Sequence, residues 1–194
     1  MTRPSIEAIA IGASAGAVQA LSCILPELPA DYPLPVLVVV HVPPDRNNML
    51  VPLFQAKCRI LVREAEDKEP ILPGVVYFAP SDYHLLVEAD RTISLSSDAP
   101  ALYSRPSIDF LFESAADAYG PALLGVILTG ANEDGAAGLK AVREAGGFAL
   151  VEDPTRAYAS AMPKAALEAS PLAKTMALEH IASYLASIPK TGVA

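Results

Sequence analysis

The sequence carries a serine within a run of small residues that directly follows a short apolar stretch. Residues 6–11, with isoleucines among alanines, predict a buried strand, and the chain continues as Gly12-Ala13-Ser14-Ala15-Gly16-Ala17. A helical period of apolar residues begins only at Val18. We therefore expect a strand, a tight turn and a helix, with Ser14 near a helix N-terminus whose backbone N–H groups are unpaired.

Three chemical interpretations of Ser14 stay open. Gly12-x-Ser14-x-Gly16 fits the nucleophile elbow, in which small neighbours permit the strained turn that exposes the hydroxyl. The same letters fit an altered phosphate-binding loop, with Ser14 in place of the middle glycine of G-x-G-x-x-G. In the third interpretation Ser14 is the N-cap of the following helix. A Walker loop is excluded, because no Lys-Ser or Lys-Thr pair follows the glycines.

A serine attacks a carbonyl only when a neighbouring base takes its proton, and the sequence offers three histidines. His41 directly follows the apolar run 36–40, which predicts a central parallel strand, and it is the best candidate for the base. A hydrogen-bonded core histidine is the alternative at this position. We expect His84, at the start of a short strand, to form structural hydrogen bonds, and His180 to face solvent. A Rossmann dinucleotide site would place an acid at the position of His41.

The acid that would orient this base is less well determined by the sequence. Asp134 precedes Gly135 and a predicted helix, so it is either the orienting acid or an N-cap. Four other carboxylates compete for the role: Glu133, Asp153, Asp109 and Asp45. Because the histidines are scattered and no C-x-x-C pair is present, we expect neither a metal site nor a cofactor.

Apolar runs and helical periods alternate along most of the chain. The principal predicted strands cover residues 6–11, 36–40, 123–128 and 148–151. Predicted helices begin near 18 and cover 107–119, 136–145, 164–168 and 178–188. Short strand candidates at 60–63, 75–78, 84–88 and 92–95 predict a small antiparallel β-meander inserted between these units.

This alternation predicts an α/β fold with a doubly wound, mostly parallel, Rossmann-like sheet in a single domain over residues 1–194. Carboxyl ends of parallel strands meet at one edge of a sheet. We therefore expect Ser14, His41 and the loop that contains Asp134 to be neighbours.

The composition narrows the classes of partner. Hydrophobic residues make up 52% of the chain and charged residues 19%, which predicts a packed globular protein. No apolar run approaches the roughly 18 residues that span a bilayer, and no signal peptide is evident, so we expect no membrane insertion. The net charge of −8 argues against a nucleic-acid partner. Two cysteines, Cys23 and Cys58, imply no disulfide framework and favour a cytoplasmic location.

Several stretches resemble, in order, the catalytic domain of the chemotaxis protein-glutamate methylesterases of the CheB type. They include Gly12–Gly16, His41-Val42-Pro43, Leu128–Leu139, residues 73–80, Arg105–Asp109 and Met162–Ala166. The resemblance covers about residues 6–188. It implies a doubly wound sheet with a serine hydrolase site, in which Ser14 is the nucleophile, His41 the general base and Asp134 the orienting carboxylate.

The resemblance also implies a reaction, the hydrolysis of γ-glutamyl methyl esters on a chemoreceptor-like protein, with deamidation of certain glutamines as a related activity. We expect the oxyanion to be held by the Ala15 N–H and by an N–H of the turn 130–132. Two alternatives stay open: a serine esterase or amidase with another substrate on the same scaffold, and a non-catalytic binding module in a signalling complex.

Some features depart from the family pattern. Full-length members carry a receiver domain before the esterase, whereas this sequence starts at the catalytic strand, so we expect a stand-alone or truncated chain and a separate receiver protein as regulator. Ala17, Ala131, Glu152 and Ala161 stand where glycine, methionine, glutamine and glycine are usual. None of these departures removes Ser14, His41 or Asp134.

Overall fold

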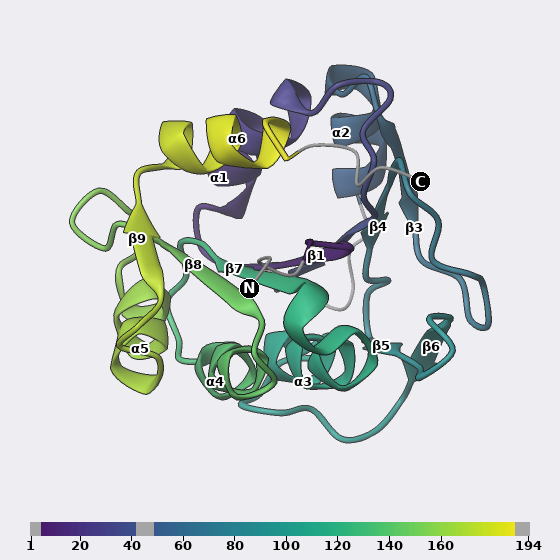
Figure 1. Cartoon of the computed structure of the whole chain (residues 1–194). Helices are drawn as coiled ribbons and strands as arrows, with labels where there is room; N and C mark the ends of the chain where they lie inside the picture. Colours follow the sequence, from purple (N-terminus) through teal and green to yellow (C-terminus); the bar gives the residue numbers. More distant parts are fainter. Residues whose placement is uncertain (1–4, 42–48, 189–194) are drawn as a thin grey trace.

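Seven parallel strands form the central sheet of the computed structural model, which describes residues 5–41 and 49–188. The strand order is β3-β4-β2-β1-β7-β8-β9 (Figure 1). The bounds are β1 Ala8–Ala13, β2 Val36–Val40, β3 Leu61–Glu64, β4 Val75–Phe78, β7 Leu123–Ile127, β8 Phe148–Glu152 and β9 Lys174–Met176. Strands β1, β2 and β7 are buried along their whole length, as their continuous apolar sequences predict for central parallel strands.

Helices cover both faces of this sheet, so the predicted doubly wound α/β fold is confirmed (Figure 1). On one face lie α1 (Ala17–Ile24), α2 (Leu50–Lys57) and α6 (Leu178–Ala186); on the other lie α3 (Ile108–Tyr119), α4 (Ala136–Glu144) and α5 (Ala161–Ala169). Single 3₁₀ turns, η1 (Leu25–Glu27) and η2 (Gly120–Ala122), follow α1 and α3. Side chains alternate along β1: Ile9 and Ile11 enter the core under α1 and α6, whereas Ala8 and Ala10 face α3.

The antiparallel insertion is smaller than expected from the sequence. It consists of β5 (His84–Val87) and β6 (Ile93–Ser96) alone. The other two segments of the expected meander, β3 and β4, pair in parallel with each other and join the main sheet. Two neighbouring strands can be parallel only if the chain between them leaves the sheet and returns to its starting edge. The connection 65–74 does so and pairs with the β6 region on the way, where the Lys68 N–H donates to the Ile93 carbonyl at 2.8 Å.

Two elements were not predicted, and each has a weak sequence signal. Helix α2 contains Pro52 in its first turn and buries only Leu50 and Phe54. Strand β9 has three residues and lies at the edge of the sheet, where its side chains are largely exposed. Neither segment therefore shows the apolar periodicity on which the predictions depended.

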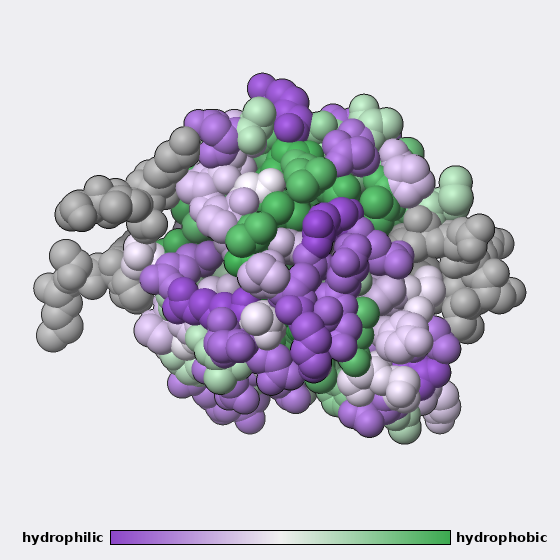
Figure 2. All heavy atoms as spheres, turned by 90° about the vertical axis from the view of Figure 1, so that its right-hand side faces the viewer, coloured by the Kyte–Doolittle hydropathy of each residue, from purple (hydrophilic) through white to green (hydrophobic). Residues whose placement is uncertain are grey.

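The β3 edge of the sheet faces the viewer in Figure 2. Hydrophilic side chains cover much of this face, and a hydrophobic area lies among them (Figure 2). On β3, Arg63 pairs with Glu69 and its guanidinium lies 5.5 Å from the centroid of the Tyr77 ring. A charged side chain on an edge strand opposes pairing with the edge of another sheet.

Over residues 5–41 and 49–188, no helix is long and apolar enough to cross a membrane.

The order of connections determines where a site can form. The chain runs from β1 to β2 on one side, adds β3 and β4 there, and then crosses to β7 on the other side of β1. In open α/β sheets, the crevice at such a reversal, at the carboxyl ends of the strands, is where ligands bind. Here the segments after β1, β2 and β7 meet at that edge, and they carry Ser14, His41 and Asp134.

Candidate active site

Ser14 occupies a turn that is held by backbone hydrogen bonds on both sides. Its N–H donates to the Thr129 carbonyl at 2.9 Å, and its own carbonyl accepts the Ala17 N–H at 2.9 Å. Gly16, with φ of 86°, holds the N-cap position of α1, and a Cβ at that residue would lie 2.7 Å from Cβ of Tyr158. The N-cap interpretation of Ser14 is therefore wrong: Gly16 has that place and, as a glycine, has no side chain with which to cap α1.

His41 lies beside Ser14 on the neighbouring strand. Strands β1 and β2 pair Ala13 with Val40, and the His41 N–H continues the ladder to the Ala13 carbonyl at 3.2 Å. Ser14 and His41 are thus the next pair in register, on strands about 4.8 Å apart. Alternation along both strands directs the two side chains to the face that α3 covers. Between these two described residues, the serine hydroxyl and the imidazole do not form a hydrogen bond.

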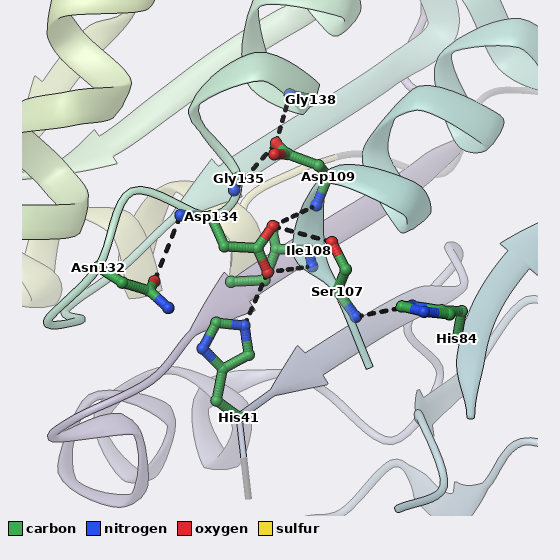
Figure 3. Close-up of polar contacts among 9 residues, drawn as sticks. All are labelled: His41, His84, Ser107, Ile108, Asp109, Asn132, Asp134, Gly135 and Gly138. Atoms are coloured by element: carbon green, nitrogen blue, oxygen red, sulfur yellow. Dashed lines mark hydrogen bonds and ion pairs between the residues drawn. The ribbon is translucent and has the colours of Figure 1, made fainter. Parts of the chain in front are cut away.

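Asp134 is fully buried and is surrounded by hydrogen-bond donors. Its Oδ2 accepts the His41 Nε2–H and the Ile108 N–H, both at 2.7 Å, and its Oδ1 accepts the Ser107 hydroxyl at 2.9 Å and the Asp109 N–H at 3.1 Å (Figure 3). Burial by itself would raise the pKa of Asp134, but the hydrogen bonds from His41, Ile108 and Asp109 outweigh it and lower the pKa. Asp134 therefore stays ionised beside the His41 ring.

The competing acids lie elsewhere. Glu133 is exposed, Asp153 binds the N–H and hydroxyl of Thr155, and Asp45 lies outside the described residues. Asp109 is close to the site, but its Oδ1 accepts the N–H groups of two glycines at the start of α4. Burial, and then the charge of Asp134, raise the pKa of Asp109 to about 6. Of the four candidate acids that the structure describes, Asp134 alone contacts His41.

The other histidines take the places expected from the sequence. His84 is buried, its Nδ1 accepts the Ser107 N–H at 3.1 Å, and its Nε2–H donates to the Ala99 carbonyl at 3.2 Å. Burial lowers the pKa of His84 and keeps the ring neutral. His180 is exposed on α6. The structural role of His84 is confirmed, and it extends to the site because Ser107 also binds Asp134.

The residue types and spacing in the sequence did not identify Ser107 as part of the site. Its hydroxyl contacts the Asp134 carboxylate although the two residues are separated by 27 positions. Its place directly before α3 is a signal of helix N-capping. The Ser107 hydroxyl makes no such cap here and instead donates to Asp134, whose carboxylate accepts the first N–H groups of α3.

Backbone contacts narrow the choice of oxyanion donors. The Gly130 N–H donates to the Ala159 carbonyl at 3.0 Å, and the Gly130 carbonyl accepts the Met162 N–H. The Gly130 N–H is therefore not available to bind an oxyanion. No described residue accepts the N–H of Ala15 or of Ala131. Of the N–H groups expected to bind the oxyanion, those of Ala15, Ala131 and Asn132 therefore remain candidates.

Thr129 connects the serine turn with the segment after β8. Its hydroxyl donates to the Ala15 carbonyl at 2.7 Å, and its N–H donates to Oε2 of the buried Glu152 at 2.8 Å. Glutamine is usual at this position in the CheB-type methylesterases that the sequence resembles. Its side-chain amide oxygen would accept the same hydrogen bond from Thr129, so either residue can make this contact. Burial raises the pKa of Glu152.

A cavity of about 430 Å³ opens beside the loop that precedes Asp134. Its lining includes Asn132 and Glu133 of that loop, Leu102 and the fully exposed Tyr103 from the segment before α3, and Lys164 of α5. Within the described part of the chain, no cluster of His, Cys, Asp and Glu side chains is arranged to hold a metal ion.

A doubly wound sheet with a serine, a histidine and a buried carboxylate at the topological switch point has the side-chain set of a serine hydrolase. The chain belongs to the CheB methylesterase family, whose model matches residues 9–185. Its fold matches the Thermotoga maritima CheB methylesterase catalytic domain with a TM-score of 0.90 and 32% identity, over 95% of this chain and 100% of that one. The chain is thus a carboxylic-ester hydrolase of this family.

Two relatives illustrate the range of lengths in the family. A Leptospira interrogans protein, provisionally named protein-glutamate methylesterase/protein-glutamine glutaminase, is 47% identical over 176 residues, which are 91% of each chain. A Myxococcus xanthus protein with the same pair of activities in its name is 40% identical over 186 residues, which are 96% of this chain and 52% of that one. The chain therefore spans about half the length of the second relative.

Proposed function

We propose that this chain hydrolyses γ-glutamyl methyl esters of a chemoreceptor-like protein to glutamate and methanol, with Ser14 as nucleophile, His41 as general base and Asp134 as orienting carboxylate. The observation that carries the proposal is the 2.7 Å hydrogen bond between His41 and the buried Asp134, made beside the turn that holds Ser14. The names of the relatives supply the substrate class.

The proposed reaction has two halves. Ser14 Oγ attacks the ester carbonyl carbon while His41 Nδ1 takes the hydroxyl proton, and His41 then gives that proton to the departing methanol. Water attacks the glutamyl–Ser14 ester, His41 takes a proton from the water, and the proton returns to Ser14 as glutamate leaves. A glutamine side chain would form the same acyl-enzyme with loss of ammonia, which accounts for the second activity in the relatives' names.

Asp134 serves this reaction in two ways. Its bond to Nε2–H fixes the tautomer in which Nδ1 is free of a proton, and its charge stabilises the imidazolium that forms when Nδ1 accepts one. The N–H groups of Ala15 and Ala131 are the proposed donors to the oxyanion of each tetrahedral intermediate.

The proposal extends to domain, partners and location. We propose that residues 1–194 form one catalytic domain, that a methylated chemoreceptor-like protein is its substrate, and that it works in the cytoplasm. The unpaired Cys23 and Cys58 support the location, because a reducing compartment keeps thiols free. A separate receiver protein as regulator stays a prediction from the resemblance.

Methanol release from a receptor fragment that carries γ-glutamyl methyl esters tests the proposal. Wild type should release methanol, whereas Ser14→Ala, His41→Ala and Asp134→Ala should not. Intact mass after treatment with a fluorophosphonate should show one adduct on wild type and none on Ser14→Ala. Ser97→Ala, which removes an exposed serine hydroxyl, is the matched control and should behave as wild type.

The two assays separate the alternatives. An adduct without methanol release would indicate an esterase or amidase with a different substrate. The absence of both would favour a non-catalytic binding module. Either result would contradict the proposed function.

A further inference from the structure

The N-termini of α3 and α4 each bind a carboxylate that comes from the other helix or its leading loop. Asp134, which precedes α4, accepts the N–H groups of Ile108 and Asp109 at the start of α3, at 2.7 and 3.1 Å. Asp109, in the first turn of α3, accepts the N–H groups of Gly135 and Gly138 at the start of α4, at 2.9 and 2.6 Å (Figure 3). Helix N-termini attract negative charge, so each aspartate holds the opposite helix.

This exchange requires a close contact between the two helices. A Cβ at Gly138 would lie 2.6 Å from Phe112 Cβ and 3.0 Å from Asp109 Cα. Glycine therefore allows the first turns of α3 and α4 to approach until the Asp109 carboxylate reaches the backbone of α4.

The bond to Gly135 has a direct consequence for Asp134. Gly135 is the next residue, so Asp109 anchors the peptide group that directly follows Asp134. The Asp134 N–H, on the other side, donates to Oδ1 of Asn132 at the longer distance of 3.3 Å. The backbone on both sides of the proposed orienting carboxylate is thereby restrained, more tightly on the side of Asp109.

We propose that Asp109 is a positioning residue that sets the place of the Asp134 carboxylate against His41; this rests on the role of Asp134 under the proposed function. In the described structure, the Asp109 side chain has no hydrogen bond to His41, Ser14 or Asp134, so it acts through the first turn of α4. Both glycine N–H groups donate to the same atom, Oδ1. The positioning role therefore requires an acceptor oxygen at the place of Oδ1, which the side chain of an asparagine also supplies.

Two substitutions of Asp109 separate position from charge. Asp109→Asn keeps an acceptor oxygen in the place of Oδ1 and removes the charge, whereas Asp109→Glu keeps the charge and moves the oxygen by one methylene group. Val142→Ala is the control for stability, because Val142 is buried on α4, at the opposite end of the helix from Asp134.

Three quantities would be measured on each full-length variant: the melting temperature, kcat and KM for methanol release from an esterified receptor fragment, and the downfield proton NMR signal of the His41 Nε2–H without substrate. Asp109→Glu should lower kcat by about 10- to 100-fold with KM changed less than about twofold, and should shift or broaden the signal. Asp109→Asn and Val142→Ala should keep the signal and retain kcat within about threefold.

Three results would overturn the proposal: full kcat in Asp109→Glu, an equal loss in Asp109→Asn, or an equal loss in Val142→Ala at the same melting temperature. If Asp109→Glu does not fold, Asp109→Ala replaces it as the variant without the acceptor, with the same expected losses. If wild type releases no methanol, the proposed function fails, and the NMR comparison alone still decides whether Asp109 positions Asp134.

Discussion

The Nε2–H of His41 donates to Oδ2 of Asp134 at 2.7 Å, although 93 positions separate the two residues. In the serine protease template, the carboxylate binds Nδ1 and the serine faces Nε2. Here Asp134 follows β7, and β1 lies between β7 and the strand that ends at His41, so the nitrogen farther from the backbone reaches the carboxylate. Under the proposed function, Nδ1 is therefore the atom that takes the serine proton.

Removal of His41 should raise the pKa of Asp134, since the hydrogen bond and charge of His41 lower it against burial. We expect a higher carboxyl pKa in His41→Ala and partial recovery in His41→Gln, which keeps an N–H donor near the place of Nε2. Carbon-13 NMR titration of Asp134 checks this. The same pKa in His41→Ala and wild type would show that the bond is absent in solution.

Asp109→Asn should stabilise the protein at neutral pH. Burial raises the folded pKa of Asp109 to about 6, above its ordinary value of 3.8, so the folded state holds the proton more tightly and loses stability as the pH rises from about 4 to about 6. Asparagine does not titrate, which should make the variant more stable than wild type by on the order of 1–3 kcal/mol at pH 7.5.

Thermal unfolding of Asp109→Asn and wild type from pH 4 to pH 8 checks this. The difference should shrink as the pH falls from about 6 toward 4, where Asp109 is protonated in the folded wild type and, with its ordinary pKa of 3.8, about half protonated in the unfolded state. A constant difference over the whole range would contradict the shifted pKa.

Ser107→Ala should remove one of the hydrogen bonds that fix the Asp134 carboxylate. The substitution leaves Oδ1 with the Asp109 N–H as its remaining partner in the described structure. A hydrogen bond to a charged group contributes about 1.5–3 kcal/mol, so we expect a loss of stability of that order and a lower kcat. Chemical denaturation and methanol release measure the two effects; Ser97→Ala, at an exposed site, should change neither.

Gly12 and Ile108 should be energetically coupled. A Cβ at residue 12 would lie 2.3 Å from Cγ2 of Ile108, so Gly12→Ala should destabilise the fold by about 1–3 kcal/mol. Ile108→Ala opens a cavity at a cost of about 2–5 kcal/mol. In the double variant the new methyl group fills part of that cavity, so the combined cost should be less than the sum. A double-mutant cycle from urea unfolding measures the coupling, and additive costs would refute the contact.

Much of the fold could be predicted because its strands are short apolar runs and its helices have clear apolar stripes. The stripe predicted for α3, from Ile108 to Tyr119, is buried as expected. The pairing of β3 and β4 could not be predicted in the same way, since partner and direction depend on where the connection 65–74 runs. Val75–Phe78 did carry a signal for the main sheet, because its hydrophobic residues are continuous rather than alternating; the structure buries all four.

The sequence predicted which loops form the candidate site, although not every residue in it. Apolar strands that end at Ser14, His41 and the segment before Asp134 place these residues at one edge of a parallel sheet. The choice among the five acids could not be made from residue types or spacing alone, since each carboxylate has a plausible local role as a cap or a surface charge. The resemblance to the family selected Asp134.

The sequence by itself determined most of the local elements and the chemical inventory, because apolar periodicity, small residues and turn residues act over a few positions along the chain. Only the tertiary structure decided which groups meet. The N-terminus of α3 is brought to the end of β7, where Ser107, Ile108 and Asp109 donate to Asp134. The physical reason is that unpaired backbone N–H groups and a buried carboxylate satisfy each other only across a contact between elements, and that contact depends on packing over the whole sheet.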